Sequence, residues 1–242
     1  MLDKTDGVVL RVLKHTDSTS IVDLYTKDFG RRSYVVSVPK TRKSKIKYHL
    51  LQPLSLININ FTTRSKSSLP RIHEINVLLP YLSISYDPIK SALAFFISEF
   101  LYRVLREEVA SPSLFNYLLH SFQWLDQARS NIANYHIVFL IRFTRFIGLY
   151  PNIEEYGREQ YFDMLNASFV QEKPLNHPYF LNLEESRWLL RLTRLNYESM
   201  HRLSLNRHQR NRCIEVIESY YRLHLPTFPE LKATSVLKEL FN

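Results

Sequence analysis

The chain has 242 residues and a formal net charge of +9, and 45% of its residues are hydrophobic. This hydrophobic content is enough for a packed core and excludes an intrinsically disordered chain. The single cysteine excludes an intramolecular disulfide framework, and only four glycines argue against glycine-rich phosphate loops.

The first eighty residues have the pattern of a β-structure. Five short segments are rich in β-branched and aromatic residues, and no strong helical period separates them. Residues 27–30 supply a turn in which Gly30 is free to take a positive φ. The sequence predicts a five-stranded OB-like β-barrel over residues 1–80, with strands at residues 8–13, 21–26, 31–38, 54–61 and 71–79.

From Pro88 onward, apolar residues recur every three or four positions, which is the period of an amphipathic helix. Residues 132–149 are apolar on nearly every side and predict the central buried helix, which Gly148 and Pro151 end. The fold class is therefore α+β and multidomain, because an all-α helical domain over residues 81–242 follows the barrel. The helices are expected at residues 89–109, from residue 111, and at residues 132–149, 184–197, 206–223 and 235–241.

The longest apolar stretches, residues 92–104 and 136–149, are interrupted by charged residues. Both fall short of the ~20 apolar residues that a membrane span needs. The N-terminal residues are polar and carry no secretory signal pattern. We expect a cytoplasmic protein that does not bind a membrane.

The positive charge is concentrated at the start of the chain. Residues 1–80 hold 14 Lys and Arg against 6 Asp and Glu, whereas the remaining residues hold 18 against 17. A basic loop carries the densest charge, through Lys40, Arg42, Lys43, Lys45 and Lys47. A charge run is often only a solvated connection, but cations without neighbouring acids repel one another until a polyanion approaches. The charge pattern therefore predicts nucleic acid as the partner of this loop.

Two further residues are candidates for this interface. Arg31 and Arg32 are adjacent on a strand and point to opposite faces, and Arg32 shares its face with apolar residues. Arg31 is therefore the better candidate for a nucleic-acid groove. Tyr48 follows the basic loop and is expected to stack on a base, the alternative being that it fills the barrel.

Arg142 and Arg145 lie three positions apart in an otherwise apolar segment. Such arginines either pair with a buried acid, for example Glu99, or lie at a groove that captures an acidic peptide. A second set of arginines at helical spacing offers the same alternative: Arg187, Arg191 and Arg194.

No catalytic constellation is visible in the sequence. The motifs G-x-S-x-G and G-x-x-x-x-G-K-[ST] are absent, and the nine histidines are scattered without metal-ligand spacing. Cys213 is expected to be a small buried apolar residue. We therefore expect a protein that is not an enzyme and has no metal and no cofactor.

Several short segments follow one another in a characteristic order and spacing. They are Gly7-Val8-Val9-Leu10, Asp23-Leu24-Tyr25-Thr26, Gly30-Arg31-Arg32, the basic loop, Leu51-Gln52-Pro53-Leu54, residues 143–151 with their Gly148-Leu149-Tyr150-Pro151 ending, and residues 231–240. This order resembles the RecO family of bacterial recombination mediators over most of the chain.

The resemblance implies a DNA-binding recombination mediator of recombinational repair, associated with the nucleoid. Such a protein binds single- and double-stranded DNA, anneals complementary strands and, with RecR, helps load recombinase on DNA coated with single-strand binding protein. The resemblance also implies that Arg142 and Arg145, or the second set of arginines, hold the C-terminal tail of that coating protein. Two alternatives from other classes remain: an RNA-binding OB-fold protein associated with tRNA or ribosomes, and a non-catalytic adaptor.

The chain departs from the family in one respect. Many RecO relatives carry a four-cysteine zinc module after the Gly-x-x-Pro segment, but residues 152–162 contain no cysteine, and Tyr156 stands where the first ligand is expected. With Cys213 alone, a thiolate zinc site is excluded in one chain. We expect an irregular insert over residues 152–182 instead, held by the packing of Tyr156, Tyr161 and Phe162.

Overall fold

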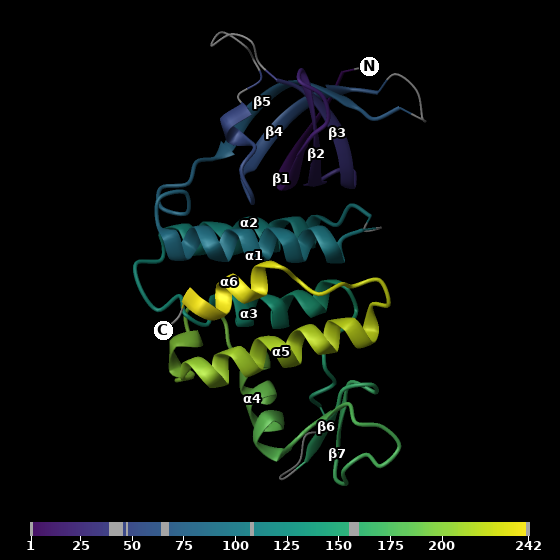
Figure 1. Cartoon of the computed structure of the whole chain (residues 1–242), viewed down its shortest axis with the longest axis vertical. Coiled ribbons are helices and arrows are strands. Elements are labelled where there is room, and N and C mark those ends of the chain that lie inside the picture. The colour runs from purple at the N-terminus through teal and green to yellow at the C-terminus, as the bar shows by residue number, and fades with distance from the viewer. Residues whose placement is uncertain are drawn as a thin grey trace. The chain divides into compact units, whose positions relative to one another are not determined.

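The computed structural model describes residues 2–38, 46, 48–63, 68–106, 109–154 and 160–240 (Figure 1). The chain forms two compact units. The first unit comprises Met1–Gln127 and Leu231–Leu237, and the second comprises Ala128–Glu230 and Lys238–Asn242.

The first unit begins with a five-stranded barrel of the OB type, as the sequence predicted. The strand order is β1-β2-β3-β5-β4, and the pairing of β1 with β4 closes the barrel. Neighbouring strands are antiparallel except β3 and β5, whose short parallel pairing joins Val35 to Arg71 and Val36 to Ile72. The strands are β1 (Leu2–Lys14), β2 (Thr19–Thr26), β3 (Gly30–Ser37), β4 (Leu56–Thr62) and β5 (Arg71–Leu79).

Alternation along the strands places one set of side chains inside the barrel. Gly30 closes the turn from β2 to β3 with a φ of 65°, the left-handed conformation that glycine adopts without strain. The buried core of the barrel consists of Val9, Val22, Leu24, Tyr34, Val36, Ile46, Leu51, Ile57, Ile59, Phe61, Ile72 and Ile75.

Strand β1 begins six residues earlier than expected, at Leu2. The prediction started at Val8 because most of the preceding residues are polar. Pairing with β4, from Leu2 opposite Thr62 to Asp6 opposite Asn58, extends the strand through these residues. Cross-strand partners therefore outweigh the weak β-propensity of this segment.

Two helices follow the barrel within the first unit, α1 (Pro88–Val104) and α2 (Pro112–Gln127) (Figure 1). Asp87 caps α1 by accepting the backbone N–H of Ile89 at 2.8 Å. The Ser98 hydroxyl donates to the carbonyl of Leu10 at 2.6 Å and ties α1 to β1. Helix α1 ends at Val104, short of the expected residue 109. The first unit also contains most of the last helix, α6 (Ala233–Leu240).

The second unit is built around α3 (Tyr135–Phe143), in which every residue except Arg142 is buried. This confirms the central buried helix, but the helix is shorter than expected. It tightens into the 3-10 turn Thr144–Phe146, where the Thr144 hydroxyl donates to the carbonyl of Ile141 at 2.6 Å. The neighbouring helices are α4 (Leu183–Arg194) and α5 (Arg207–His224), and each begins with an asparagine capping box.

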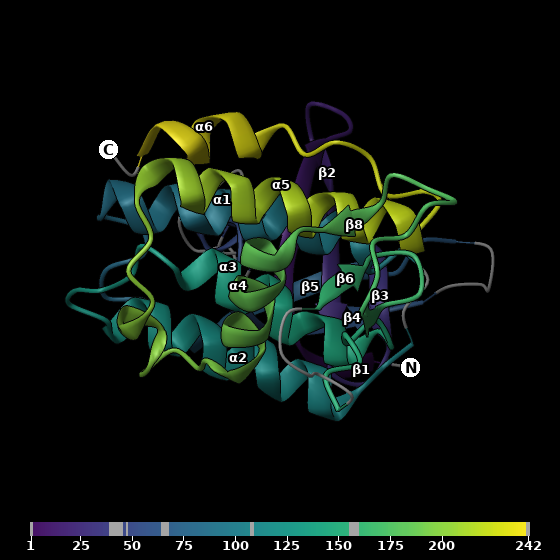
Figure 2. The ribbon, with the colours of Figure 1, turned by 90° about the horizontal axis from the view of Figure 1, so that it is seen from below.

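The prediction of an irregular insert over residues 152–182 was wrong in part. Its described residues contain a three-stranded sheet of order β7-β6-β8, formed by β6 (Tyr161–Asp163), β7 (Ser168–Val170) and β8 (Phe180–Leu181). Strands of two or three residues are too short to show a period in the sequence. Figure 2 shows β8 alongside α5, with β6 next to it.

Two of the three aromatic residues expected to hold the insert are described. Phe162 is buried, and its ring centre lies 5.0 Å from that of Phe169 and 6.1 Å from that of Tyr220. The Tyr161 ring meets Phe180 edge-on at 6.0 Å. Tyr156 lies outside the described residues. Within them, no group of three or more His, Cys, Asp or Glu side chains is placed to hold a metal ion.

The chain is thus α+β, with a five-stranded barrel followed by a mainly helical region. The last barrel strand ends at Leu79 and the first helix begins at Pro88. The division into an OB-like domain at residues 1–80 and a helical domain at residues 81–242 stays a prediction. No helix in the described ranges combines the length and apolar character needed to cross a membrane.

Candidate nucleic-acid interface

The basic loop connects the end of β3 to the short helical turn at Tyr48–Leu50. Its five cations, at positions 40, 42, 43, 45 and 47, lie outside the described residues. Between them, Ile46 is 8% exposed and belongs to the barrel core. The loop therefore continues from β3, and one residue within it, Ile46, is anchored in the barrel core.

Tyr48 is partly buried and packs against the barrel core. Its hydroxyl shares a hydrogen bond of 2.9 Å with the hydroxyl of Ser20 on β2. This position favours the barrel-filling alternative for the ring. Stacking of Tyr48 on a base stays a prediction.

Arg31 and Arg32 diverge, as expected for neighbours on a strand. Arg31 is partly buried, and its guanidinium carbon lies 4.4 Å from the ring centre of Tyr102 on α1. Arg32 is exposed at the beginning of β3, and its guanidinium lies 5.0 Å from the ring centre of Phe29. Tyr34 and Val36, which alternate with Arg32, are fully buried.

Arg31 belongs to an arginine cluster, defined here as Arg11, Arg31 and Arg103 around the ring of Tyr102. The guanidinium carbons of Arg11 and Arg103 lie 4.9 Å and 5.5 Å from the ring centre. Arg11 Nη1 also donates to the Tyr102 hydroxyl at 2.7 Å. The cluster joins three elements of the first unit, because its arginines come from β1, β3 and α1.

The sequence analysis singled out Arg31 alone among these residues. Helical and strand periods show which residues share a face of one element, but they do not show which elements meet. The packing of α1 against β1 brings Tyr102 and Arg103 to the two strand arginines. No local pattern in the sequence predicts that these residues lie next to one another.

A hollow of about 360 Å³ borders the arginine cluster and is lined by Arg11, Arg103, Phe95 and Lys232, among others. Phe95 is 60% exposed. Glu99, which also lines the hollow, accepts the backbone N–H of Ala233 at 2.8 Å. Its carboxylate is thus engaged at the beginning of α6.

The second unit holds Arg142 and Arg145. Arg142 donates to the carbonyl of Leu195 at 3.3 Å. Arg145 is exposed, with its guanidinium 4.4 Å from the ring centre of Tyr150 and its Nη2 2.7 Å from the hydroxyl of that tyrosine. Neither arginine forms an ion pair with a carboxylate in the part of the chain that is described. The second set of arginines is exposed on α4.

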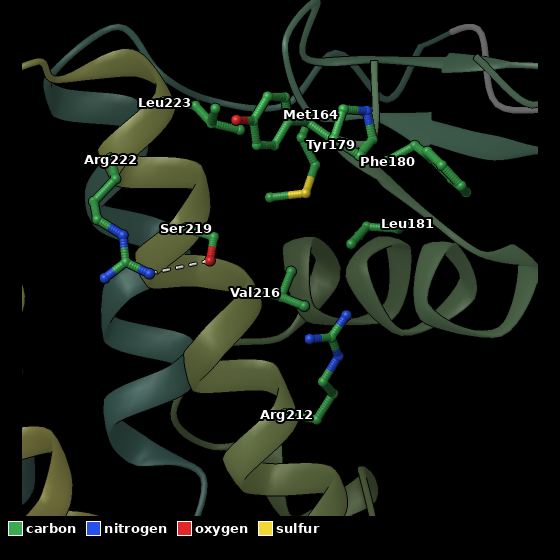
Figure 3. Close-up of a pocket in the computed structure, with 10 residues that line it drawn as sticks. Met164, Tyr179, Phe180, Leu181, Arg212, Val216, Ser219, Arg222 and Leu223 are labelled. Atoms are coloured by element: carbon green, nitrogen blue, oxygen red, sulfur yellow. Dashed lines mark hydrogen bonds between the residues drawn. The ribbon is translucent and has the colours of Figure 1, made fainter. Parts of the chain in front are cut away.

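The second unit also contains a pocket of about 430 Å³ between α5 and the segment around β8 (Figure 3). Apolar side chains line it, including Met164, Leu181 and Val216, and Arg212 and Arg222 stand at its edge. A hydrogen bond from Arg212 to Glu185, 2.6 Å long, raises the pKa of this guanidinium. The sequence analysis missed this pocket because it did not predict β8.

Cys213 lies on α5 and is 4% exposed, which confirms the small buried residue that the sequence predicted. Burial raises the pKa of its thiol to about 11. A thiol protonated at neutral pH is a poor nucleophile and a poor metal ligand.

Comparison with known proteins identifies the family. The family model described as "Recombination protein O N terminal" matches residues 1–81, and the one described as "Recombination protein O C terminal" matches residues 85–232. The chain is 50% identical to the DNA repair protein RecO of Bacteroides fragilis and 51% identical to that of Phocaeicola vulgatus, in both cases over the full length of both proteins. It is 30% identical to the DNA repair protein RecO of Flavobacterium psychrophilum over 99% of each chain. The chain therefore belongs to the RecO family of DNA repair proteins.

Proposed function

We propose that the chain is a recombination mediator that binds single- and double-stranded DNA and anneals complementary strands. With RecR as its partner, it helps load recombinase on DNA coated with single-strand binding protein. Membership of the RecO family supports a role in DNA repair. The observation that carries the proposal is the basic loop, which is inserted between β3 and β4 of an OB-type barrel.

The mechanism is electrostatic. The five loop cations, together with Arg31, neutralise phosphates and let two backbones approach each other with little reading of the bases. If the loop alone contacts about five phosphates of a single strand, the plot of log binding constant against log salt concentration has a slope of about −3.5. The OB-like domain at residues 1–80 carries the basic loop, and the helical domain at residues 81–242 carries the candidate arginines for the tail of single-strand binding protein. The protein acts without catalysis and is found on the nucleoid.

The second unit binds the C-terminal tail of single-strand binding protein. A tail that is acidic and ends in an aromatic residue needs a cation beside an apolar hollow. The pocket of Figure 3 supplies both, through Arg222 and side chains such as Met164 and Val216. Arg142 and Arg145 form the alternative position for the same tail.

Strand annealing tests the proposed function. Two complementary oligonucleotides, coated with single-strand binding protein, are mixed with the wild-type chain or with a variant in which the five loop cations are changed to alanine. We expect rapid annealing by the wild type, and loss of annealing in the alanine variant and at high salt. The matched control exchanges Lys for Arg and Arg for Lys at the same five positions, and we expect it to anneal normally because the charge is kept.

Three outcomes contradict parts of the proposal. Annealing by the alanine variant at the wild-type rate moves the DNA site away from the loop. A strong preference of the wild type for RNA favours the RNA-binding alternative, because only RNA carries the 2′-hydroxyl that a protein can contact to distinguish it from DNA. The absence of any salt-dependent binding of nucleic acid favours the adaptor.

A further inference from the structure

We infer that the arginine cluster and the hollow beside Phe95 form a second binding site for single-stranded DNA. The arginines hold the phosphates of the strand, and an unpaired base enters the hollow and stacks on Phe95. This inference rests on the proposed DNA-binding function and assigns a separate site for the second strand of the annealing reaction.

The guanidinium groups of the cluster have unused hydrogen-bond donors. Arg11 donates to the hydroxyl of Tyr102, whereas Arg31 and Arg103 have no hydrogen-bond acceptor among the described residues. A guanidinium carries five N–H groups in a planar fork that matches the oxygens of a phosphate. A phosphate placed at the cluster therefore receives donors that the described protein groups do not use.

The charges of the cluster also favour the binding of an anion. Three guanidinium groups share one tyrosine ring at 4.4–5.5 Å, and none of them forms an ion pair with a carboxylate in the described ranges. The ring attracts each cation but does not neutralise its charge. Asp23 is the residue opposite Arg11 on β2, and its carboxylate accepts the hydroxyl of Ser33. Glu99 lines the hollow beside the cluster, and its carboxylate accepts the backbone N–H groups of Lys232 and Ala233. The cations Arg11, Arg103 and Lys232 outnumber this carboxylate along the hollow, so the described side chains there keep an excess of positive charge.

The hollows beside the cluster suit an unpaired base. Phe95 borders both the hollow of about 360 Å³ and a second one of about 300 Å³, which Tyr81 also lines. Its exposed ring is therefore accessible from both hollows. Bases stack on such rings when the strand is single, because a duplex hides the faces of its bases. The exposed ring of Phe95 next to the arginines favours a single strand over an acidic peptide as the occupant.

The cluster and the start of the basic loop lie at opposite ends of β3. Arg31 is the second residue of β3, and the loop leaves the barrel after Ser37, the last residue of that strand. Six residues of strand span about 20 Å. The barrel therefore has the cluster at one end of β3 and, at the other end, the strand terminus from which the basic loop continues. Two sites are what the pairing of two strands requires.

Binding of a labelled single-stranded oligonucleotide, measured at several salt concentrations, tests the inference. The cluster variant carries Arg11→Ala, Arg31→Ala and Arg103→Ala. We expect the salt slope of this variant to be smaller than that of the wild type by about 2, which corresponds to three phosphates of a single strand. The matched control removes three exposed arginines of the second unit, through Arg129→Ala, Arg202→Ala and Arg207→Ala, and we expect it to keep the wild-type slope.

Two further variants separate the site from a general effect on folding. Changing the three cluster arginines to lysine keeps the charge, and we expect this variant to retain most of the slope. We expect Phe95→Ala to weaken the binding of single strands about tenfold, through loss of stacking, and to leave the binding of duplex unchanged. Phe95 is exposed, so this variant tests the site even if the cluster variant fails to fold.

Each outcome decides the inference. The inference is overturned if the cluster variant has the wild-type slope or if Phe95→Ala binds single strands with the wild-type affinity. The proposed function still stands in either case, provided that the alanine variant of the basic loop loses annealing. A cluster variant that keeps its affinity for DNA but loses that for an acidic peptide overturns it as well. A wild-type chain that binds no DNA overturns both the inference and the proposed function.

Discussion

The ammonium group of Lys90 lies 2.9 Å from the backbone carbonyl oxygen of Asp126, and both residues are buried. The Asp126 carboxylate accepts three backbone N–H groups of the segment that leads from β5 to α1, at 2.8–3.0 Å. The donors are Leu82, Ser83 and Ile84. One aspartate at the end of α2 thus fixes the segment from which α1 begins.

We expect Asp126→Ala to destabilise the first unit by about 3 kcal/mol, because it leaves buried N–H groups without an acceptor. Urea unfolding followed by circular dichroism measures this loss. Asp17→Ala is the control, since Asp17 is fully exposed and pairs with the exposed Lys14. No measurable change is expected for the control. A stability of Asp126→Ala equal to that of the wild type would show that water replaces the carboxylate without cost.

The same aspartate predicts a dependence of stability on pH. Burial alone raises the pKa of Asp126, but hydrogen bonds from the backbone of Leu82, Ile84 and Ser83 outweigh burial and lower it. Because the pKa is lower in the folded state, Asp126 stabilises the protein at pH values above its pKa in the unfolded chain, about 3.9. This contribution is lost as the pH falls through the pKa of the folded state. We expect the difference in unfolding free energy between wild type and Asp126→Asn to be constant near neutral pH and to shrink below about pH 4. A difference that stays constant down to pH 2 would contradict this assignment.

The strands of the barrel were predictable because their residues carry the signal themselves. Residues 71–79 alternate and are rich in β-branched and aliphatic side chains, and β5 has these bounds in the structure. Where the signal depends on a partner, the prediction failed. The first residues of β1 are polar and become a strand through pairing with β4, and β6, β7 and β8 are too short to show a period.

The candidate interface was predictable in its charge but not in its geometry. Counting cations identified the basic loop, because like charges close in sequence remain close in space. The arginine cluster combines Arg11, Arg31 and Arg103, which are far apart in the sequence and meet only because α1 packs on the barrel. Which faces of two elements meet is decided by the packing of the whole unit, which no window of the sequence contains.

The packing of Phe162 predicts how the insert holds together without zinc. Phe162 is 1% exposed and contacts the rings of Phe169 and Tyr220. We expect Phe162→Ala to destabilise the second unit by about 3–5 kcal/mol. We also expect a chelator to leave the melting temperature unchanged and metal analysis to find no stoichiometric zinc. Stoichiometric zinc, or a melting temperature that falls with the chelator, would mean that a metal holds the insert.

The pocket beside α5 predicts where an acidic peptide binds. Arg222 stands at its edge, 4.0 Å from Glu218 and with its Nη2 3.2 Å from the Ser219 hydroxyl, so its charge is only loosely engaged. For a labelled acidic peptide that ends in phenylalanine, we expect Arg222→Ala to weaken binding about tenfold, through loss of a charge-assisted hydrogen bond. Fluorescence anisotropy measures the affinity, and Arg129→Ala, which removes an exposed arginine of the same unit, is the matched control. Normal binding by Arg222→Ala, with loss of binding in a variant that combines Arg142→Ala and Arg145→Ala, would place the peptide at these two arginines instead.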